Sequence, residues 1–317
     1  MLSIIIPTYN SERYLRPCLL GLLEFGVDDI EIIVVDSFSV DNTLSIVNEF
    51  LDQGLPIDII YAGRGLYKCW NLGLKKAKGE YIYILPSDDS VDAVELRKAM
   101  GILASDTKAE AIVSPLGVMN AKGDKSTQSP DFGSEVIYQA KQGDSVTDAL
   151  LKIWSGGVSS VTSVTQILFK KSIFGKTGFF DTTVGAIGDY FWSGKLLLRC
   201  KVIAYPMVFS WWRRHDNQVT GSNKALIESL QLMLRRHQDI QPELERRLPT
   251  MPQRYWHEKV LCFKYLIFIH KIKRLKNPLP EAHYFLSRPL RLLSLGRLLL
   301  SGSRRPRDIA TYLSKYW

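Results

Sequence analysis

The sequence predicts an α/β fold in which a mostly parallel sheet is flanked by helices. The first observation behind this prediction is that apolar runs alternate with helix-length segments over the first hundred residues, a pattern typical of repeated β-α units. The second is that two of the four apolar runs end in polar or acidic clusters, Asp36-Ser37 and Ser87-Asp88-Asp89. Because open parallel sheets bind ligands outside the carboxyl ends of their strands, this edge is the candidate site.

The individual elements follow from apolar spacing and from turn residues. The expected strands of the first part are Leu2 to Pro7, Glu31 to Asp36, Ile57 to Tyr61 and Tyr81 to Leu85. Helices are expected from Asp41 to Gln53, after Gly65, and from Asp92 to Leu103, with Gly54 and Gly79 as stops for the first two. A strand near Ala111 to Ser114 continues the layout.

From about Gly117 the pieces become shorter and are separated by turns. We expect a hairpin turn at Lys122-Gly123-Asp124, a strand from Gln166 to Lys171, a helix from Tyr190 to Arg199, and a strand from Lys201 to Trp212 interrupted by Pro206.

Composition restricts the class of protein. Of the 317 residues, 46% are hydrophobic and 23% are charged, which excludes a disordered chain and leaves room for two units or one large domain with an appendage. The four cysteines form no Cys-x-x-Cys pair, so a disulfide framework and a zinc knuckle are not expected. No leader is apparent and no apolar stretch reaches about 18 residues, which predicts a cytoplasmic protein without a membrane span.

The excess positive charge lies at one end of the chain. Residues 1–220 hold 22 Lys and Arg against 25 Asp and Glu, whereas residues 221–317 hold 19 against 7, a net charge of +12. Residues 221–317 are predicted to be mostly helical, and their basic residues alternate with aromatic ones. Such a segment suits an anionic membrane surface, and the alternative is an appendage that packs on the first part or on a second subunit. Nucleic acid is not expected as a partner, because no recognition motif accompanies the charge.

The adjacent carboxylates of Asp88 and Asp89 are the first chemical signal. Two carboxylates at a strand exit raise each other's pKa unless positive charge compensates, and a divalent cation on a diphosphate is a natural compensator. The alternative is that they only cap the following helix.

Six motifs in order resemble the family 2 inverting glycosyltransferases of GT-A fold. They are Ile4 to Asn10, Glu31 to Asp36, Gly65 to Gly73, Gly79 to Asp89, the series Phe169-Lys170-Lys171 through Gly178 to Asp181 and Gly188-Asp189-Tyr190, and Trp212 to His215. The resemblance covers roughly residues 2 to 220. It implies a GT-A type catalytic domain over residues 1–220, with a nucleotide-sugar-binding half at 1–115 and an acceptor half at 116–220.

The resemblance implies a donor site at the strand ends. By that likeness Pro7, Thr8 and Tyr9 line the floor of the nucleotide pocket, and Asp36 meets the base or ribose. The further donor-binding candidates are Ser37, Asn71 and Asp88, the last of them near the ribose or the sugar. Asp89 is implied to ligate Mn²⁺ or Mg²⁺ on the diphosphate, where the metal stabilises the charge that builds on the leaving group.

The resemblance also implies a catalytic base. Asp189 is expected to take the proton from the attacking sugar hydroxyl, since inverting transfer needs one carboxylate as base. The alternative is that Asp189 only stabilises the N-terminus of its own helix. His215 is expected to reach the diphosphate or the metal, and Arg213 to supply positive charge, although a lone histidine is also a common structural residue.

Three departures bear on specificity. The second strand ends Asp36-Ser37-Phe38-Ser39 where the family commonly has Asp-Asp-Gly-Ser, Lys68 stands where Asp is frequent, and Gly188 replaces a frequent Glu. The missing second Asp often accepts a hydrogen bond from a uracil-type base, so discrimination for uracil is expected to be weaker, with UDP-sugars the first expectation and dTDP- or GDP-sugars open.

The expected function is transfer of one sugar from a nucleotide diphosphate sugar to a hydroxyl of a glycan or lipid-linked acceptor in surface polysaccharide assembly. The site of action is the cytoplasm or the inner face of the cell membrane. Two alternatives stay open: a catalytically silent homologue that acts as a binding or assembly module, and a sugar-phosphate nucleotidyltransferase. The latter should carry a Gly-rich phosphate loop after the first strand, and Pro7 to Asn10 is not one.

Overall fold

The computed structural model describes residues 1–25, 29–126, 132–155, 160–184, 188–215 and 240–249. The chain divides into two compact units, and the described residues up to 215 belong to the first. Residues 240–249 belong to the second unit and include a helix over 240–247. The rest of the predicted basic helical segment, 221–317, lies outside the described residues.

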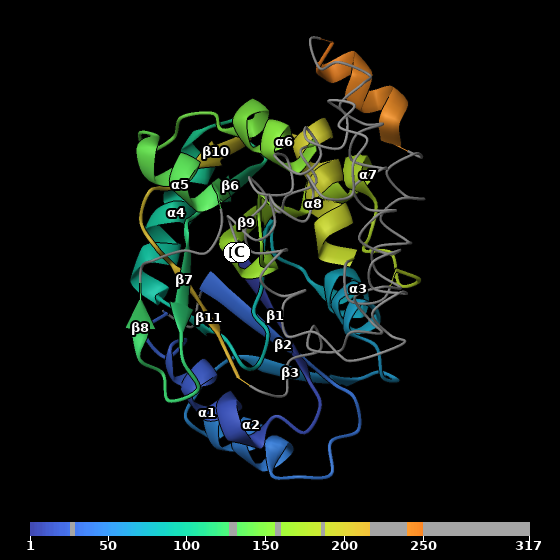
Figure 1. The fold of residues 1–317 in the computed structure, drawn as a ribbon. Coiled ribbons are helices and arrows are strands. Elements are labelled where there is room, and N and C mark those ends of the chain that lie inside the picture. The colour runs from blue at the N-terminus through green and yellow to red at the C-terminus, as the bar shows by residue number, and fades with distance from the viewer. Residues whose placement is uncertain (26–28, 127–131, 156–159, 185–187, 216–239, 250–317) are drawn as a thin grey trace, which may run out of the picture. The chain divides into compact units, whose positions relative to one another are not determined.

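A seven-stranded sheet forms the centre of the first unit as described (Figure 1). Its order is β10-β6-β9-β4-β1-β2-β3. Only β9 runs antiparallel to its neighbours β4 and β6; the other pairs in this sheet are parallel. The bounds are Leu2–Thr8 for β1, Ile30–Asp36 for β2, Ile57–Tyr61 for β3, Tyr81–Ile84 for β4, Ala111–Val113 for β6, Ile167–Lys170 for β9 and Val202–Ala204 for β10. The predicted mostly parallel sheet is confirmed.

Helices cover both faces of this sheet. On one face α1, α2 and α4 share an apolar core with alternate residues of β1, β2 and β4; these helices are Glu12–Leu20, Thr43–Asp52 and Ala93–Ser105. On the other face α3 lies so close that a Cβ on Gly73 would come within 2.5 Å of the Ile5 side chain. Helices α7 and α8 join α3 there through a cluster of aromatic rings. The bounds are Leu66–Lys76 for α3, Phe174–Thr177 for α7 and Gly188–Arg199 for α8.

Two more α-helices and two 3-10 helices are described in this unit. Helix α6 packs on α8, where the Trp154 indole N–H donates to the Tyr190 carbonyl at 2.9 Å. The bounds are Phe132–Gln139 for α5, Thr147–Ser155 for α6, Val164–Gln166 for η2 and Lys171–Ile173 for η3.

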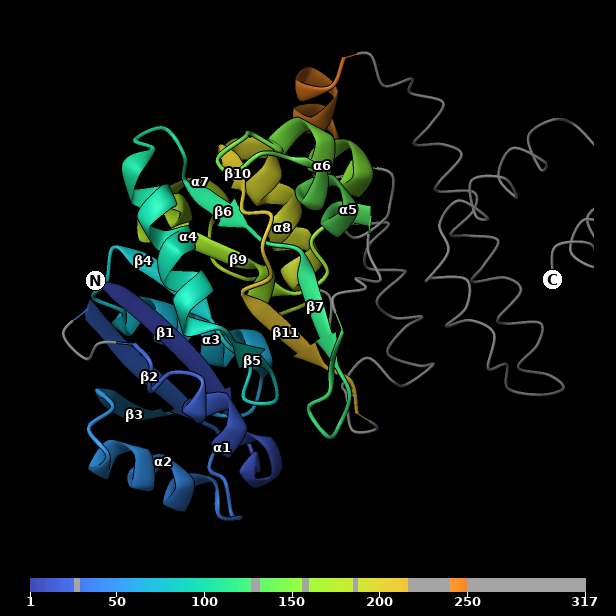
Figure 2. The same cartoon turned by 90° about the vertical axis from the view of Figure 1, so that its left-hand side faces the viewer.

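A smaller sheet of order β5-β11-β7-β8 stands beside the first (Figure 2). Its strands are Ser90–Val91, Ser210–Arg213, Leu116–Met119 and Lys125–Ser126 in that order. The predicted interruption of the Lys201 to Trp212 stretch at Pro206 is confirmed, but the two halves are separate strands, β10 of the large sheet and β11 of the small one. Pro206 separates the two, since proline has no N–H to donate to a ladder. The predicted hairpin turn at Lys122-Gly123-Asp124 is confirmed between β7 and β8.

The two glycines predicted as helix stops have different roles. Gly54 follows α2 with φ of +95°, which confirms it as the left-handed residue that ends a helix. Gly79 is not a helix stop, because α3 already ends at Lys76. Its N–H donates to the Ser3 hydroxyl at 2.8 Å, and a Cβ there would lie 2.6 Å from that oxygen. Gly79 thus permits a close backbone approach to β1.

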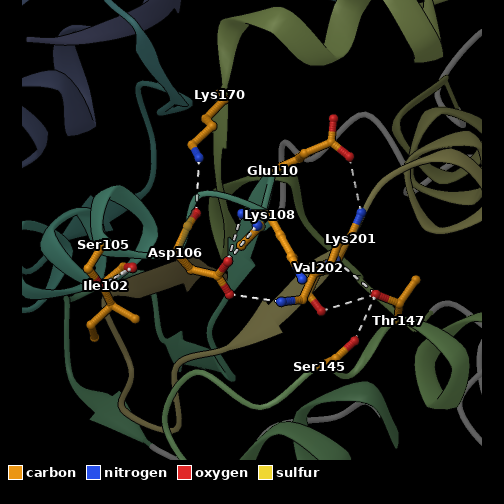
Figure 3. Close-up of polar contacts among 11 residues, drawn as sticks. Ile102, Ser105, Asp106, Lys108, Glu110, Ser145, Thr147, Lys170, Lys201 and Val202 are labelled. Carbon is orange, nitrogen blue, oxygen red and sulfur yellow. Dashed lines mark hydrogen bonds and ion pairs between the residues drawn. The ribbon is translucent and has the colours of Figure 1, made fainter.

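A polar network fixes the β10 edge of the large sheet at the amino ends of its strands (Figure 3). Lys201 Nζ contacts Asp106 Oδ2 at 2.8 Å, and this bond contributes most to lowering the pKa of Asp106 to about 2. Thr147 accepts from the Val202 N–H at 2.8 Å and donates to the carbonyl of the same residue at 3.1 Å. The network lies at the opposite edge from the carboxyl ends of β1, β2 and β4, so it stabilises the fold and takes no part in the candidate site.

Candidate donor site and catalytic carboxylate

The carboxyl ends of β1 and β2 are joined by a buried hydrogen bond. Their parallel register places Thr8 beside Asp36, and the Thr8 hydroxyl donates to Asp36 Oδ1 at 2.8 Å. Asp36 also accepts from the Ser39 hydroxyl at 2.6 Å and from the Ser39 N–H at 2.8 Å. The Asp36 side chain is completely buried, so in this structure its carboxylate organises the loop after β2.

That loop holds an aromatic residue in a strained conformation. Phe38 has φ of +60°, a left-handed backbone that costs a non-glycine residue about 1–2 kcal/mol. Its side chain is 64% exposed and stacks on Tyr61, itself 53% exposed, with ring centroids 5.6 Å apart and planes at 21°. An exposed stacked pair on a constrained loop offers a flat surface for another ring.

The other donor-site candidates of this edge differ in exposure. Tyr9 is 40% exposed, and the Arg64 guanidinium lies 3.9 Å from the centroid of its ring. Pro7 is buried in β1. Ser37 is buried as well, and its hydroxyl lies 3.3 Å from Cys69 Sγ. Of these side chains, Tyr9 and Arg64 therefore present the accessible surface.

The small sheet brings the end of β4 to the end of β11. Strands β5 and β11 are antiparallel, with Ser90 opposite Trp211, and continuing that register past β5 places Asp88 near the residues that follow Trp212. His215 Nε2 lies 2.9 Å from Asp88 Oδ2, with the two side chains 9% and 34% exposed. Tyr14 of α1 packs against the imidazole with a centroid distance of 4.9 Å. The pair is thus positioned by three elements and reaches solvent on the Asp88 side.

Asp89 faces the opposite way. Its side chain is 2% exposed, and Oδ1 accepts the Arg213 backbone N–H at 2.9 Å. Burial, together with the neighbouring charge of Asp88, raises the pKa of Asp89 well above its ordinary value. The two carboxylates follow a turn in which the Asp89 N–H donates to the Pro86 carbonyl at 3.0 Å, and only the Asp88 carboxylate faces the accessible edge.

Arg213 is buried and holds the backbone around this pair. Its Nε donates to the Asp88 carbonyl at 2.7 Å, and Nη1 donates to the carbonyls of Asn120 and Ala121, each at 3.4 Å. The guanidinium also lies 4.9 Å from the centroid of the Tyr14 ring. Arg213 therefore supports the Asp88 and His215 region from beneath.

Asp88 and His215, which share a hydrogen bond in this structure, are side chains of the kinds that bind a divalent cation. Two neighbouring ligands of an octahedral ion with bonds of about 2.1 Å lie about 3 Å apart, which is close to the separation of 2.9 Å between these atoms. Among the described residues no cluster of three or more His, Cys, Asp or Glu could hold a metal. A two-residue site suits an ion that takes its remaining ligands from phosphate oxygens and water, as Mg²⁺ and Mn²⁺ do.

Asp189 occupies a different environment at the beginning of α8. Oδ1 accepts from the Tyr67 hydroxyl at 3.1 Å and from the Tyr190 N–H at 2.9 Å. Burial raises the pKa of Asp189 to about 6, although both hydrogen bonds lower it. A carboxyl with this pKa is largely ionised at neutral pH and is more basic than an ordinary aspartate, as a general base requires.

The Asn71 side chain joins two segments of the fold. Its Nδ2 donates to the Phe180 carbonyl at 2.8 Å, and its Oδ1 accepts the Phe180 N–H at 3.0 Å. Both ends of the amide are therefore used to join α3 to the segment before α8, and no donor contact is evident for Asn71.

The structure adds residues that the sequence reasoning did not single out. They are Tyr14, Phe38, Arg64 and Tyr67. Two of them lie where the sequence departs from the family pattern. Phe38 occupies the position of a glycine in that pattern, and Tyr67 directly precedes Lys68, which stands where the family frequently has Asp. Tyr14 and Arg64 carried no such signal.

Comparison with known proteins places the chain in a family. Residues 3–174 match Glycosyl transferase family 2. Curated relatives include the probable glycosyltransferase YdaM of Bacillus subtilis (strain 168), 32% identical over 72% of this chain and 56% of its own length. Another is the poly(ribitol-phosphate) beta-N-acetylglucosaminyltransferase TarS of Staphylococcus aureus, 30% identical over 42% of this chain and 24% of its own length. An uncharacterized glycosyltransferase of Haemophilus influenzae is 33% identical over 32% of this chain.

Only part of each relative is matched, since the chain covers 42% of the length of the Haemophilus protein. Among solved structures, TarS residues 1–349 with UDP-GlcNAc has a TM-score of 0.63 at 19% identity, covering 89% of this chain and 77% of that one. The mannosyltransferase PcManGT from Pyrobaculum calidifontis, with GDP-Man and Mn²⁺, has a TM-score of 0.56 at 20% identity, covering 99% and 83%. These likenesses confirm the GT-A fold. Within the part of the chain that the structure describes, no helix is long and apolar enough to cross a bilayer.

Proposed function

Because the chain belongs to glycosyl transferase family 2, we propose that it transfers a single sugar, with inversion, from a nucleotide diphosphate sugar to a hydroxyl of a glycan or glycolipid. The observation that carries this proposal is the Asp88 and His215 pair at the carboxyl edge of the sheet, 2.9 Å apart. An accessible carboxylate beside an imidazole is a set of ligands for a cation that carries a diphosphate.

Asp88 and His215 hold the metal in this proposal, and Asp89 has a supporting role. The sequence alone pointed to Asp89, but its carboxylate is buried against the Arg213 backbone. When bound, Mn²⁺ or Mg²⁺ neutralises the charge that develops on the departing diphosphate. Asp89 and Arg213 keep the β5 and β11 ends together, so they determine where Asp88 and His215 meet.

The nucleoside is proposed to lie at the ends of β1, β2 and β3. Exposed aromatic surfaces occur there on Tyr9 and on the Phe38 and Tyr61 pair, and aromatic rings stack on a base without choosing among bases. Structures of relatives of the same fold contain UDP-GlcNAc and GDP-Man. A UDP-sugar remains the first expectation, with GDP- and dTDP-sugars next, because Ser37 offers no carboxylate to an imide N–H.

Asp189 is the proposed base. As the acceptor hydroxyl oxygen bonds to the anomeric carbon, its proton passes to Asp189, and the bond from that carbon to the diphosphate oxygen breaks on the opposite face. The pKa of about 6 leaves the carboxylate ionised at neutral pH and ready to accept the proton. One displacement without a covalent intermediate inverts the anomeric configuration.

The acceptor is proposed to be a glycan or a lipid-linked glycan at a membrane surface. A lipid-linked acceptor is supported by the net charge of +12 in residues 221–317, since clustered Lys and Arg are attracted to anionic lipids. Surface polysaccharide assembly is the setting that we propose, in line with the relative TarS, which is named as a poly(ribitol-phosphate) beta-N-acetylglucosaminyltransferase.

A thermal-shift panel tests the donor half of this function. UDP, dTDP, GDP, ADP and CDP are added to the full chain, each with and without Mn²⁺. We expect one or two diphosphates to raise the unfolding temperature only when Mn²⁺ is present. If none of the five acts at millimolar concentration, the donor proposal is contradicted and the silent-homologue interpretation is favoured.

A further inference from the structure

A tyrosine from another helix contacts the proposed base. The Tyr67 hydroxyl donates to Asp189 Oδ1 at 3.1 Å, across 122 positions of sequence. The Tyr190 N–H also donates to Oδ1, at 2.9 Å. Oδ1 thus receives one bond from α3 and one from the first turn of α8, and the two together fix the orientation of the Asp189 carboxylate.

The Tyr67 ring is fixed by its neighbours. It is 4% exposed, stacks on Phe180 with planes at 9° and centroids 5.9 Å apart, and meets the edge of Trp70 at 5.1 Å. Phe180 is itself held by both ends of the Asn71 amide. Since Asn71 and Tyr67 lie on the same helix, α3 fixes both the ring and the residue on which it stacks.

Gly188 makes room for this contact. A Cβ at position 188 would lie 2.6 Å from Tyr67 Cε2 and 2.8 Å from both Cδ2 and Cζ, distances that a packed ring does not tolerate. Glycine is therefore required beside Asp189 as long as Tyr67 occupies its place. The departure of Gly188 from the family's frequent Glu thus has a steric cause in this chain.

We infer that Tyr67 is a positioning residue for the base, holding the Asp189 carboxylate through Oδ1 in the orientation in which it meets the acceptor hydroxyl, and that Gly188 is the residue that permits it. The inference rests on the proposed function of Asp189. Asn71, which the resemblance placed in the donor site, serves this arrangement by fixing Phe180.

The hydrogen bond from Tyr67 to Asp189 should affect the pKa of the Asp189 carboxyl. Of the described titratable groups packed against Asp189, Tyr67 of α3 contacts the carboxylate, whereas the Tyr190 hydroxyl on its own helix donates to the Trp154 carbonyl at 3.4 Å. The Tyr67 hydroxyl stabilises the ionised carboxylate, so its removal raises the pKa of Asp189 further. A hydrogen bond to a charged group corresponds to about one pKa unit or more.

The test measures the pKa of Asp189 without relying on turnover. Unfolding free energies of the full chain and of Asp189→Asn are determined by urea denaturation from pH 4 to pH 8, and their difference reports the titration of residue 189. The same pair is measured in a Tyr67→Phe background, which keeps the ring and its stacking. We expect the midpoint to move from about pH 6 to about pH 7. An unchanged midpoint overturns the inference.

Rates give the second readout. We expect Tyr67→Phe to lower the rate of diphosphate release about threefold at pH 6.5, to approach the rate of the unaltered chain above pH 8, and to leave Mn²⁺-dependent diphosphate binding unchanged. Gly188→Ala should behave in the same way, whereas Gly175→Ala, where no atom lies within 4 Å of the added Cβ, should have no effect. A parallel loss at every pH would indicate a purely structural role and overturn the inference. Full activity of Asp189→Asn would instead contradict the proposed function.

Discussion

His215 Nε2 lies 2.9 Å from Asp88 Oδ2, although the two residues are 127 positions apart in the sequence. The contact depends on the pairing of β5 with β11 and on the packing of Tyr14 against the imidazole. A two-stranded contact outside the main sheet therefore assembles the proposed metal site, and each of its residues comes from a different motif of the sequence.

Asp88 and His215 should each be required for metal-dependent nucleotide binding. We expect Asp88→Asn or His215→Gln to lower the affinity for Mn²⁺ in the presence of UDP by at least about tenfold, because even the loss of an outer-sphere partner costs about 10- to 100-fold. Isothermal titration of the full chain measures this effect. Asp52→Asn, at an exposed site on α2, is the control and should bind as the unaltered chain does. If Asp89→Asn removes the Mn²⁺ dependence and Asp88→Asn keeps it, the ligand is Asp89.

Asp189→Asn should inactivate the enzyme and stabilise the fold. Loss of a positioned base lowers the rate by about 10²- to 10⁴-fold. The folded-state pKa is raised to about 6, so the stability linked to this group is complete below about pH 4 and is lost as the pH rises through 6. At pH 7.5 the substitution should therefore raise the free energy of unfolding by about 1–3 kcal/mol, and near pH 4 the gain should vanish. Equal stability of the two chains at both pH values would contradict the raised pKa.

The left-handed backbone of Phe38 should lower the stability of the fold, and its ring should contribute to nucleotide binding. Phe38→Gly and Phe38→Ala both remove the ring that stacks on Tyr61, but only glycine relieves the left-handed backbone. The glycine variant should therefore be more stable than the alanine variant by about 1–2 kcal/mol in urea denaturation. Both should bind the preferred diphosphate more weakly than the unaltered chain, by roughly 5- to 100-fold if about 1–3 kcal/mol of stacking is lost. Unaltered binding in both variants would place the base elsewhere.

The basic segment should bind anionic vesicles. Each Lys or Arg near such a surface contributes about 1 kcal/mol, so replacing Lys271, Lys273 and Arg274 together by Gln should weaken binding to phosphatidylglycerol vesicles roughly a hundredfold at low salt. Replacement of Lys75, Lys76 and Lys78, which are exposed on and after α3, is the matched control and should have little effect. Raising the salt should weaken binding by the unaltered chain, given a Debye length of about 8 Å at physiological ionic strength. Equal effects of the two triple substitutions would argue against the segment as the membrane contact.

The sequence by itself determined the fold class and most of the main strands. The runs that became β1, β2, β3 and β4 are apolar and bounded by turn residues, and a fully buried parallel strand needs only such a run. The same local logic predicted a site at the carboxyl edge and drew attention to Asp88, whereas His215 and Asp189 entered through the resemblance to the family. It failed at Lys201 to Trp212, because a single extended stretch does not reveal that its halves join different sheets.

The tertiary structure decided which polar side chains are exposed and which are used within the fold. Asp88 and Asp89 are neighbours with the same chemistry, and only the β5 and β11 pairing directs one outward and buries the other. Asp36 and Asn71 have the residue types of ligand-binding groups, yet their polar atoms are used within the fold. Tyr67 and Gly188 acquire their relation to Asp189 through the packing of α3 on α8. Short-range spacing encodes backbone conformation, whereas the orientation of a polar side chain depends on partners that lie far along the chain.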